Sequence, residues 1–382
     1  MRVYGIFLAL IQYTGIYRNH YSSTPELHLT GPRVTDLSVN IKVEEPVNPN
    51  SIIVRVCITN EGNQEYRVLR SPNSLFDRSY LSDKFNPVKK DDSQIRPKFF
   101  GNLYKWSPEE AVVQKEYTTF NSGAKETYEY VYELNDRYNF FQSGAGIYTL
   151  NPTPYILLLD SNNNIEQALY KAQPYAEITI PKSFKSGNQM QMPIIQANNT
   201  SADDDYHMIP SCSRPRACPN PGTDGCLKQI KDAAIMAETL ARDAFYHLED
   251  NYEDWSLLLA SWFGARDQNR ARLVRQRLGN LAVGGFSRYD WVCDCSLGPL
   301  YAFVRLQEPA TVHICPMFWK ADTIGADSRA GTIYHEASHF VAGTKDWEYG
   351  VRTCSALARN EANKAIENGD SYEYFAEKIF PF

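Results

Sequence analysis

The chain of 382 residues lacks several features that mark particular classes of protein. No stretch reaches the roughly 18 to 20 apolar residues that a membrane-spanning helix needs, so we expect no membrane span. There is no dense run of Lys or Arg, and 39 basic against 45 acidic residues give a net charge of −6, which argues against nucleic acid as a partner. With 21 each of Gly and Pro and 43% hydrophobic residues, the sequence is neither collagen-like nor disordered.

The first half of the chain carries the alternation of apolar and polar residues that is typical of half-buried strands. The runs that carry it are residues 37–43, 52–58, 128–132, 156–159 and 176–180. The length favours two domains of roughly 150 to 200 residues each. We therefore predict that residues 23–182 form an all-β antiparallel sandwich.

The pattern changes beyond this region. Residues 183–210 are rich in Ser, Asn, Gln and Pro with little periodicity, which predicts a linker. From Leu227 to Leu248 apolar residues recur at intervals of three and four, and a second helical pattern covers residues 265–281. Residues 211–382 are therefore predicted to form a second, predominantly helical domain.

The N-terminus and the cysteines bear on the compartment. Residues 1–22 contain Arg2 followed by a short apolar run that resembles a secretion signal, with a first buried strand as the alternative. None of the eight cysteines forms a C-x2-C pair, so disulfides in an oxidising compartment are favoured over a zinc cluster. We expect a secreted, extracellular protein.

One short motif carries chemistry. Residues 335–339 read H-E-A-S-H, the H-E-x-x-H pattern. On a helix, four residues advance the side-chain direction by about 400°, so His335 and His339 project from one face and can share a zinc ion. Glu336 can then take a proton from a zinc-activated water and pass it to a leaving amine, which predicts peptide-bond hydrolysis.

A catalytic zinc ion needs a third protein ligand. Gly343 is expected to end the helix and bring Asp346 within reach as an oxygen ligand. The arrangement with three histidines fails, because Ala342 and Lys345 stand where a Gly and the third His are required. Glu361, on a following helix, is the alternative third ligand.

The motif, together with residues 343–350, which read G-T-K-D-W-E-Y-G, resembles the aspzincins, the deuterolysin family of zinc metalloendopeptidases that includes the peptidyl-Lys metalloendopeptidases. The resemblance covers residues 225–382 and implies a zincin-like α+β protease domain with one catalytic zinc ion. The ligands that it implies are His335, His339 and Asp346. It also implies that Glu336 is the catalytic base and acid and that Tyr349 donates a hydrogen bond to the oxyanion.

The resemblance also implies a pocket for the residue after the scissile bond. In the lysine-specific branch this pocket carries an Asp and a Glu three residues apart, which correspond to Asp370 and Glu373 here. Two carboxylates would attract a lysine ammonium group, so we expect a preference for Lys. A capping box with Asp370 as helix N-cap is a second interpretation, which does not exclude the first. By resemblance, Cys226 pairs with Cys293 and Cys295 with Cys315, which leaves Cys57, Cys212, Cys218 and Cys354 without assigned partners.

The first half of the chain corresponds, by resemblance, to the β-rich prosegment of secreted family members. We expect a zymogen that is cut within residues 181–210, and a permanent binding module is the alternative for this half. The expected protein is a monomeric secreted zinc endopeptidase that acts on protein or peptide substrates. The alternative from another class is a zinc-binding or cell-surface interaction protein that retains the motif without turnover.

Overall fold

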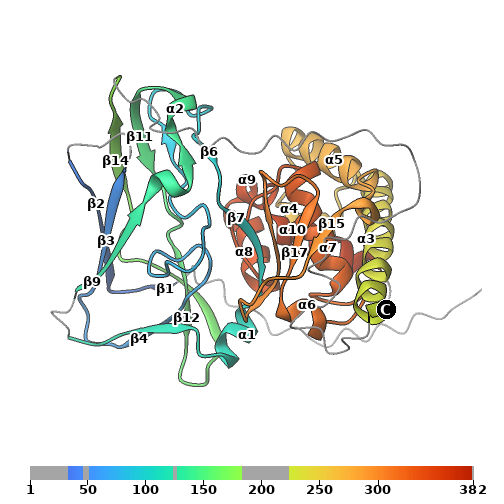
Figure 1. Cartoon of the computed structure of the whole chain (residues 1–382), viewed down its shortest axis with the longest axis horizontal. Coiled ribbons are helices and arrows are strands. Elements are labelled where there is room, and N and C mark those ends of the chain that lie inside the picture. Colours follow the sequence, from blue (N-terminus) through green and yellow to red (C-terminus); the bar gives the residue numbers. More distant parts are fainter. Residues whose placement is uncertain (1–32, 46–50, 124–126, 183–222, 381–382) are drawn as a thin grey trace, which may run out of the picture. The chain divides into compact units, whose positions relative to one another are not determined.

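The computed structural model describes residues 33–45, 51–123, 127–182 and 223–380 (Figure 1). These residues form mainly β-strands up to Ile180 and mainly helices from Thr223 onward, so the predicted order of a β-rich part followed by a helical part is confirmed. The predicted signal at residues 1–22 and the predicted linker at residues 183–210 lie outside the described residues. None of the described helices combines the length and the apolar character that a membrane crossing needs.

The β-rich part contains the predicted strands together with several shorter ones. The strands are β1 (Arg33–Val34), β2 (Leu37–Val43), β3 (Ile53–Asn60), β4 (Tyr66–Leu69), β5 (Val88–Lys89), β6 (Lys98–Phe99), β7 (Asn102–Trp106), β8 (Tyr117–Phe120), β9 (Thr127–Glu133), β10 (Tyr138–Asn139), β11 (Gly146–Leu150), β12 (Tyr155–Leu159), β13 (Ile165–Leu169) and β14 (Ala176–Ile180). Two short helices, α1 (Pro108–Val113) and α2 (Phe140–Ser143), lie among them. The prediction of an all-β region is therefore wrong in this detail.

Alternation along the strands separates a buried face from an exposed one. In the antiparallel sheet β2-β3-β9, Val54 and Val56 of β3 are fully buried, whereas Arg55 between them forms ion pairs at 2.5 Å on the other face. A second sheet has the order β1-β13-β12-β4-β8, and buried residues of both sheets share one hydrophobic core. Strand β1 runs parallel to β13, so the region is not purely antiparallel as predicted.

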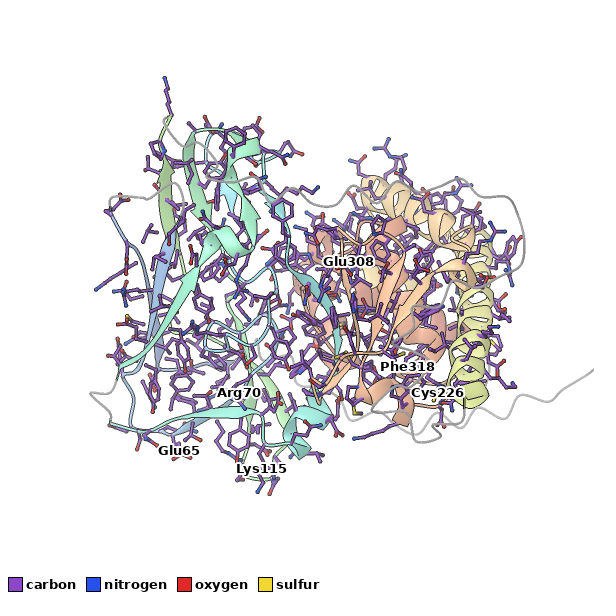
Figure 2. The ribbon with its side chains drawn as sticks, in the orientation of Figure 1. Glu65, Arg70, Lys115, Cys226, Glu308 and Phe318 are labelled. Carbon is purple, nitrogen blue, oxygen red and sulfur yellow. A yellow bond between two sulfur atoms is a disulfide. The ribbon has the colours of Figure 1, made fainter. Side chains whose placement is uncertain are left out.

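The second half packs its helices around one core. Its elements are α3 (Thr223–Asn251), α4 (Leu257–Phe263), α5 (Gln268–Ala282), β15 (Asp290–Val292), β16 (Leu300–Arg305), β17 (Thr311–Ile314), α6 (Pro316–Lys320), α7 (Arg329–Val341), α8 (Val351–Asn360), α9 (Ala362–Ala365) and α10 (Gly369–Ile379). Helix α3 presents the fully buried Ala237, Ala241 and Ala244, whose small side chains allow α7 to lie close to it. Figure 2 labels Cys226 on α3 and Phe318 on α6, which both belong to this core.

One strand of the first half joins the sheet of the second half. The sheet order is β15-β17-β16-β7, and β7 pairs antiparallel with β16, with Tyr104 opposite Phe303 and Lys105 opposite Ala302 (Figure 1). The described residues from Arg33 onward form one compact unit. The predicted arrangement of two separate domains is therefore not confirmed. The sequence of β7 could not predict its pairing with β16, because β16 lies almost 200 residues later in the chain.

The disulfides lie in the second half. Cys295 and Cys315 are bonded, with their Cα atoms 4.8 Å apart, and they are one of the two pairs that the resemblance implies. Cys226 and Cys293 are also disulfide-bonded, and their pairing with each other stays a prediction. The remaining cysteines are the free thiols Cys57 and Cys354, and Cys212 and Cys218, which lie outside the described residues. Disulfide bonding fits the expected oxidising compartment.

Candidate active site

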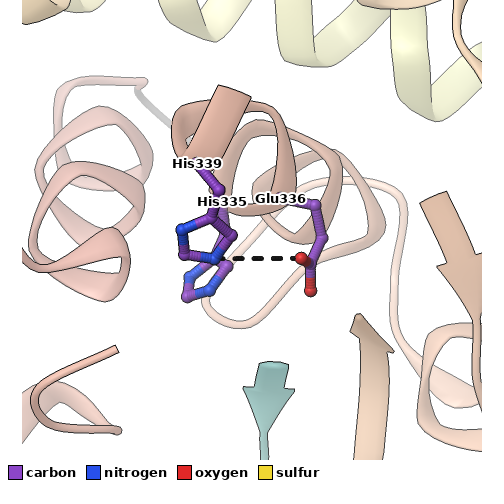
Figure 3. Close-up of side chains that lie close together, drawn as sticks. All are labelled: His335, Glu336 and His339. Atoms are coloured by element: carbon purple, nitrogen blue, oxygen red, sulfur yellow. Dashed lines mark ion pairs between the residues drawn. The ribbon is translucent and has the colours of Figure 1, made fainter. Parts of the chain in front are cut away.

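The H-E-x-x-H residues lie on α7, which is buried along most of its length. The helix begins after Ser328, whose hydroxyl accepts a hydrogen bond from the N–H of Gly331 at 2.8 Å and so caps the first turn. One helical turn separates His335 from His339, and their ring centroids lie 4.9 Å apart. Figure 3 shows both imidazoles on the same side of the helix, with the Glu336 carboxylate beside them.

Three ligand atoms converge at one point. Oδ1 of Asp346 lies 3.2 Å from Nε2 of His335 and 3.4 Å from Nε2 of His339. All three atoms are buried, and none has a hydrogen-bond partner in the described part of the chain. Zinc–ligand bonds of about 2.0 to 2.2 Å in a tetrahedron put neighbouring ligand atoms about 3.3 Å apart. The residues present therefore fit a zinc ion.

The other ring nitrogens of the two histidines also have close polar neighbours. Nδ1 of His339 lies 3.1 Å from the carbonyl oxygen and 3.0 Å from the hydroxyl oxygen of Thr344. Nδ1 of His335 lies 2.9 Å from Oδ1 of Asp370. Contacts of this kind orient metal-binding imidazoles and make them more basic. Burial lowers the pKa of His339 to about 4, so its imidazole is neutral and able to bind a metal.

Asp346 reaches the cluster through the turn after α7. Gly343 has a φ of 64°, a left-handed conformation that ends the helix as predicted. The side chain of Asn368 accepts hydrogen bonds at 2.8 and 3.0 Å from the two backbone N–H groups that follow Asp346. The N–H of Tyr104 donates to Oδ2 of Asp346 at 2.6 Å, which leaves Oδ1 directed at the imidazoles. Glu361, the alternative ligand, instead forms an ion pair with Lys364 at 2.6 Å.

The carboxylate of Glu336 has one engaged oxygen and one without a partner. Oε1 accepts a hydrogen bond from the N–H of Lys105 at 3.0 Å. Oε2 is buried, finds no hydrogen-bond partner among the described residues, and lies 3.9 Å from Nε2 of His339 (Figure 3). Burial raises the pKa of Glu336 well above its ordinary value, which makes the carboxylate a stronger proton acceptor.

Tyr349 lies near these carboxylates. Its side chain is buried, and its hydroxyl has no hydrogen-bond partner among the residues that the structure describes. Burial, followed by the charges of Asp346 and Asp370, raises the pKa of Tyr349 well above its ordinary value. The phenol therefore stays protonated and can donate a hydrogen bond. Its ring packs edge-on against Trp106 of β7, with the centroids 5.5 Å apart.

Asp370 and Glu373 form a buried acidic pocket around the ammonium group of Lys105. Nζ of Lys105 lies 2.9 Å from Oε2 of Glu373 and 3.3 Å from Oδ1 of Asp370. It also donates hydrogen bonds to Asp327 at 2.8 Å and to the hydroxyl of Tyr374 at 3.2 Å. Burial raises the pKa of Asp370, but Lys105 and the neighbouring histidine outweigh burial and lower it. The pocket is therefore an anionic site that already holds an ammonium group.

The start of α10 tests the interpretation of Asp370 as a helix N-cap. The helix begins at Gly369 with Asn368 as its N-cap residue, so Asp370 lies inside the first turn. The predicted capping box at Asp370 is therefore wrong. Gly369 is also needed for space, because a Cβ atom at this position would lie 2.8 Å from Cε1 of His335.

All seven predicted site residues come together in the structure, but sequence reasoning missed those that reach the site from elsewhere. Lys105 and Tyr104 come from β7, and Asp327 comes from the turn before α7. No motif or spacing links them to residues 335–373, since each acts through a contact between segments distant in sequence. The one local signal is the lysine between Tyr104 and Trp106, two large aromatic residues of β7.

Comparison with known proteins supports the same chemistry. The aspzincin family model described as lysine-specific metallo-endopeptidase matches residues 252–377. The peptidyl-Lys metalloendopeptidase of Pleurotus ostreatus is 38% identical over 151 residues, covering 39% of this chain and 89% of that protein. The peptidyl-Lys metalloendopeptidase of Armillaria mellea is 27% identical over 334 residues, covering 87% of this chain and 88% of that protein. An extracellular protease of Aeromonas hydrophila is 41% identical over 120 residues, covering 31% of this chain and 34% of that protein.

The matched region contains the α7 motif, the turn that carries Asp346 and the start of α10. The match to the Pleurotus protein spans most of that relative's length, and the match to the Armillaria protein includes the β-rich half of this chain. The chain is a metalloendopeptidase and belongs to the aspzincin family of lysine-specific metallo-endopeptidases.

Proposed function

We propose that this endopeptidase binds one zinc ion through His335, His339 and Asp346 and hydrolyses the peptide bond that precedes a lysine. The observation that carries the proposal is the convergence of three unpartnered ligand atoms beside a buried acidic pocket that holds a lysine ammonium group. A zinc ion bound there would lower the pKa of a coordinated water to near 7 and polarise the substrate carbonyl.

Glu336 is proposed as the proton carrier. Its Oε2 has no partner in the described chain, and its Oε1 lies within hydrogen-bond distance of a backbone amide nitrogen at the site. The carboxylate can take a proton from the attacking water and deliver it to the leaving nitrogen. Burial raises the pKa of Glu336, which strengthens the carboxylate as a proton acceptor.

Tyr349 is proposed to donate a hydrogen bond to the oxyanion that forms when water attacks the carbonyl. Its hydroxyl is buried, protonated and without a partner among the described residues. A hydrogen-bond donor that is already oriented in a site shielded from water stabilises a developing negative charge strongly, because it does not have to reorganise during the reaction.

Asp370 and Glu373 are proposed to bind the side chain of the lysine after the scissile bond. A buried ammonium group is costly unless it is paired, and these two carboxylates with Asp327 supply the pairing. A neutral or acidic side chain in this pocket would leave the carboxylates without a cation, which selects against it.

We also propose secretion and maturation by cleavage. The Cys295–Cys315 disulfide and the extracellular relative support secretion. The proposed division is a prosegment at residues 23–182, a linker at residues 183–210 that is cut on maturation, and a protease domain at residues 211–382. N-terminal sequencing of secreted protein tests the cut within residues 181–210, and a monomer stays a prediction.

Digestion of casein followed by mass spectrometry of the products tests the activity and the preference together. We expect cuts before Lys that stop when a chelator removes the metal. Cleavage that does not depend on the charge of the residue after the scissile bond would contradict the proposed role of the acidic pocket. Activity that persists after chelation would contradict the proposed zinc site. Absence of any cleavage by metal-loaded, matured protein would leave the non-catalytic alternative.

A further inference from the structure

We propose that strand β7, Asn102–Trp106, is a built-in pseudosubstrate that lies in the substrate groove and keeps the intact chain inactive, with Lys105 in the place of the substrate lysine. This inference rests on the proposed function. It goes beyond it by assigning the inhibitory segment, the residue that enters the specificity pocket, and the chain direction of the bound strand.

The backbone of β7 binds as an added strand. It pairs antiparallel with β16 over residues 102–106, and β16 would be the edge of the sheet without it. The N–H of Ser107 continues the contact by donating to the carbonyl oxygen of Pro299 at 2.8 Å. Extended peptides commonly bind by adding to an exposed sheet edge, because main-chain hydrogen bonds supply affinity without depending on sequence. An extended substrate would use the same edge.

The side chain of Lys105 supplies the specific contact. It is 0% exposed, and its ammonium group meets two fully buried carboxylates and the partly exposed Asp327. Not every buried lysine of the described residues has carboxylates around its ammonium group. Lys84 is also buried, but its ammonium group donates to the carbonyl oxygen of Pro72 and forms no ion pair with a described carboxylate. Burial lowers the pKa of Lys84, whereas the carboxylates outweigh burial and raise the pKa of Lys105.

The backbone on either side of the Tyr104–Lys105 peptide bond contacts the catalytic residues. The N–H of Lys105 donates to Oε1 of Glu336 at 3.0 Å, and the N–H of Tyr104 donates to Oδ2 of Asp346 at 2.6 Å. The nitrogen of Lys105 is the atom that would leave if this bond were cut. The proposed proton carrier, Glu336, therefore lies within hydrogen-bond distance of the position of a leaving amine. A second peptide cannot reach Glu336 and the acidic pocket while β7 lies there.

Covalent connection strengthens this inhibition. Within one chain, β7 is present at an effective concentration of mM order or higher, so peptide substrates compete poorly with it. A contact outside the strand supports the same arrangement, because Nδ2 of Asn73 donates to the carbonyl oxygen of Asp346 at 2.6 Å. Cutting the chain at residues 181–210 would turn this intramolecular ligand into one that can dissociate.

The test measures the hydrolysis of a quenched peptide containing one Lys by zinc-loaded, full-length chain, with electrophoresis to verify that the chain is intact. We expect little hydrolysis by the wild-type chain and at least about tenfold more by Lys105→Met, which leaves the buried carboxylates without their cation and so weakens β7 binding. Lys105→Arg keeps the charge and should stay inhibited. Lys84→Met is the matched control, since it removes a buried lysine of the same half that does not touch the groove.

A second measurement does not depend on a Lys105 variant that might unfold. In full-length Glu336→Gln protein, which cannot cut itself, amide hydrogen exchange of residues 102–106 should be slow. The lysine peptide, added well above the effective concentration of about mM order of the tethered strand, should accelerate exchange by displacing β7, while exchange in β12 should not change. If the exchange of residues 102–106 does not change when the peptide is added, the proposal is overturned.

The outcomes separate the two levels of inference. Full-rate hydrolysis by the intact wild-type chain would keep the proposed function and reject the inhibition. Rapid self-cleavage between Tyr104 and Lys105 would also reject it, because β7 would then be an ordinary substrate. Failure of every variant, including wild-type chain cut within residues 181–210, would reject the proposed function and the inhibition that rests on it.

Discussion

The two ring nitrogens of His335 face two different clusters of side chains. On the Nε2 side, Asp346 and His339 direct unpartnered atoms toward one point. On the Nδ1 side, Asp370 lies at 2.9 Å and Glu373 at 3.3 Å, and both also contact the ammonium group of a lysine from β7. The first cluster forms no ion pair with a Lys or Arg in the described residues, whereas the second receives its cation from the same chain.

This difference suits one cluster to a metal ion and the other to an ammonium group. Ligand atoms about 3.3 Å apart leave room for a bare metal ion and suit tetrahedral zinc. Asp370 and Glu373 instead contact an ammonium group, which needs several hydrogen-bond acceptors. His335 belongs to both clusters, so the charge of the pocket also makes this imidazole more basic.

The largest expected effect concerns the first cluster. Asp346→Ala removes an oxygen ligand and should weaken zinc binding by more than about 100-fold, since even changes outside the ligand set cost 10- to 100-fold. Zinc content after dialysis against a weak chelator measures it. Asn73→Ala, which removes only the contact to the backbone of Asp346, is the matched control. Unchanged zinc content in Asp346→Ala would mean that Asp346 is not a zinc ligand and that the first cluster is not the metal site.

The next effect concerns Glu336, which borders the metal cluster without being assigned as a ligand. Glu336→Gln keeps the size of the side chain and should lower kcat by about 10²- to 10⁴-fold, the usual contribution of a general base. Zinc content should not change. Loss of zinc in this variant would show that Glu336 is a ligand and that the composition of the first cluster is misassigned.

A smaller effect is expected in the second cluster. Glu373→Gln should lower kcat/KM for cleavage before Lys by about 10- to 100-fold, because one buried partner of the ammonium group is lost. Matched peptides with Lys or Met after the scissile bond measure this selectivity in matured enzyme. An equal loss for both peptides would show that Glu373 acts on His335 and not on the substrate.

The smallest effect is expected at the rim of the pocket. The side chain of Asp327 is 31% exposed, so water screens its charge more than those of Asp370 and Glu373. Asp327→Asn should lower kcat/KM for the Lys peptide only about two- to fivefold, a loss typical of partly exposed pairs. Its zinc content should match wild type, since Asp327 does not touch the histidines. A loss as large as that of Glu373→Gln would make Asp327 a principal part of the pocket.

Local patterns predicted several elements of the fold and one helix of the site. Alternation located β2 over its full length, and the helical period located α3 and α5 to within a few residues. The same local logic placed His335, Glu336 and His339 on one helix, and Gly343 at its end. The capping box at Asp370 was one local prediction that failed, because Asn368 is the N-cap residue and the helix begins one residue before Asp370.

By itself, the sequence determined which side chains could hold a metal, because residues four apart on one helix and a glycine turn bring their ligands together through short-range geometry. Only the tertiary structure decided what faces them. The pairing of β7 with β16 and the ion pairs of Lys105 with Asp327 and Asp370 join segments separated by some 200 residues or more. Such contacts arise from the burial and pairing of whole surfaces, so no spacing within the chain records them.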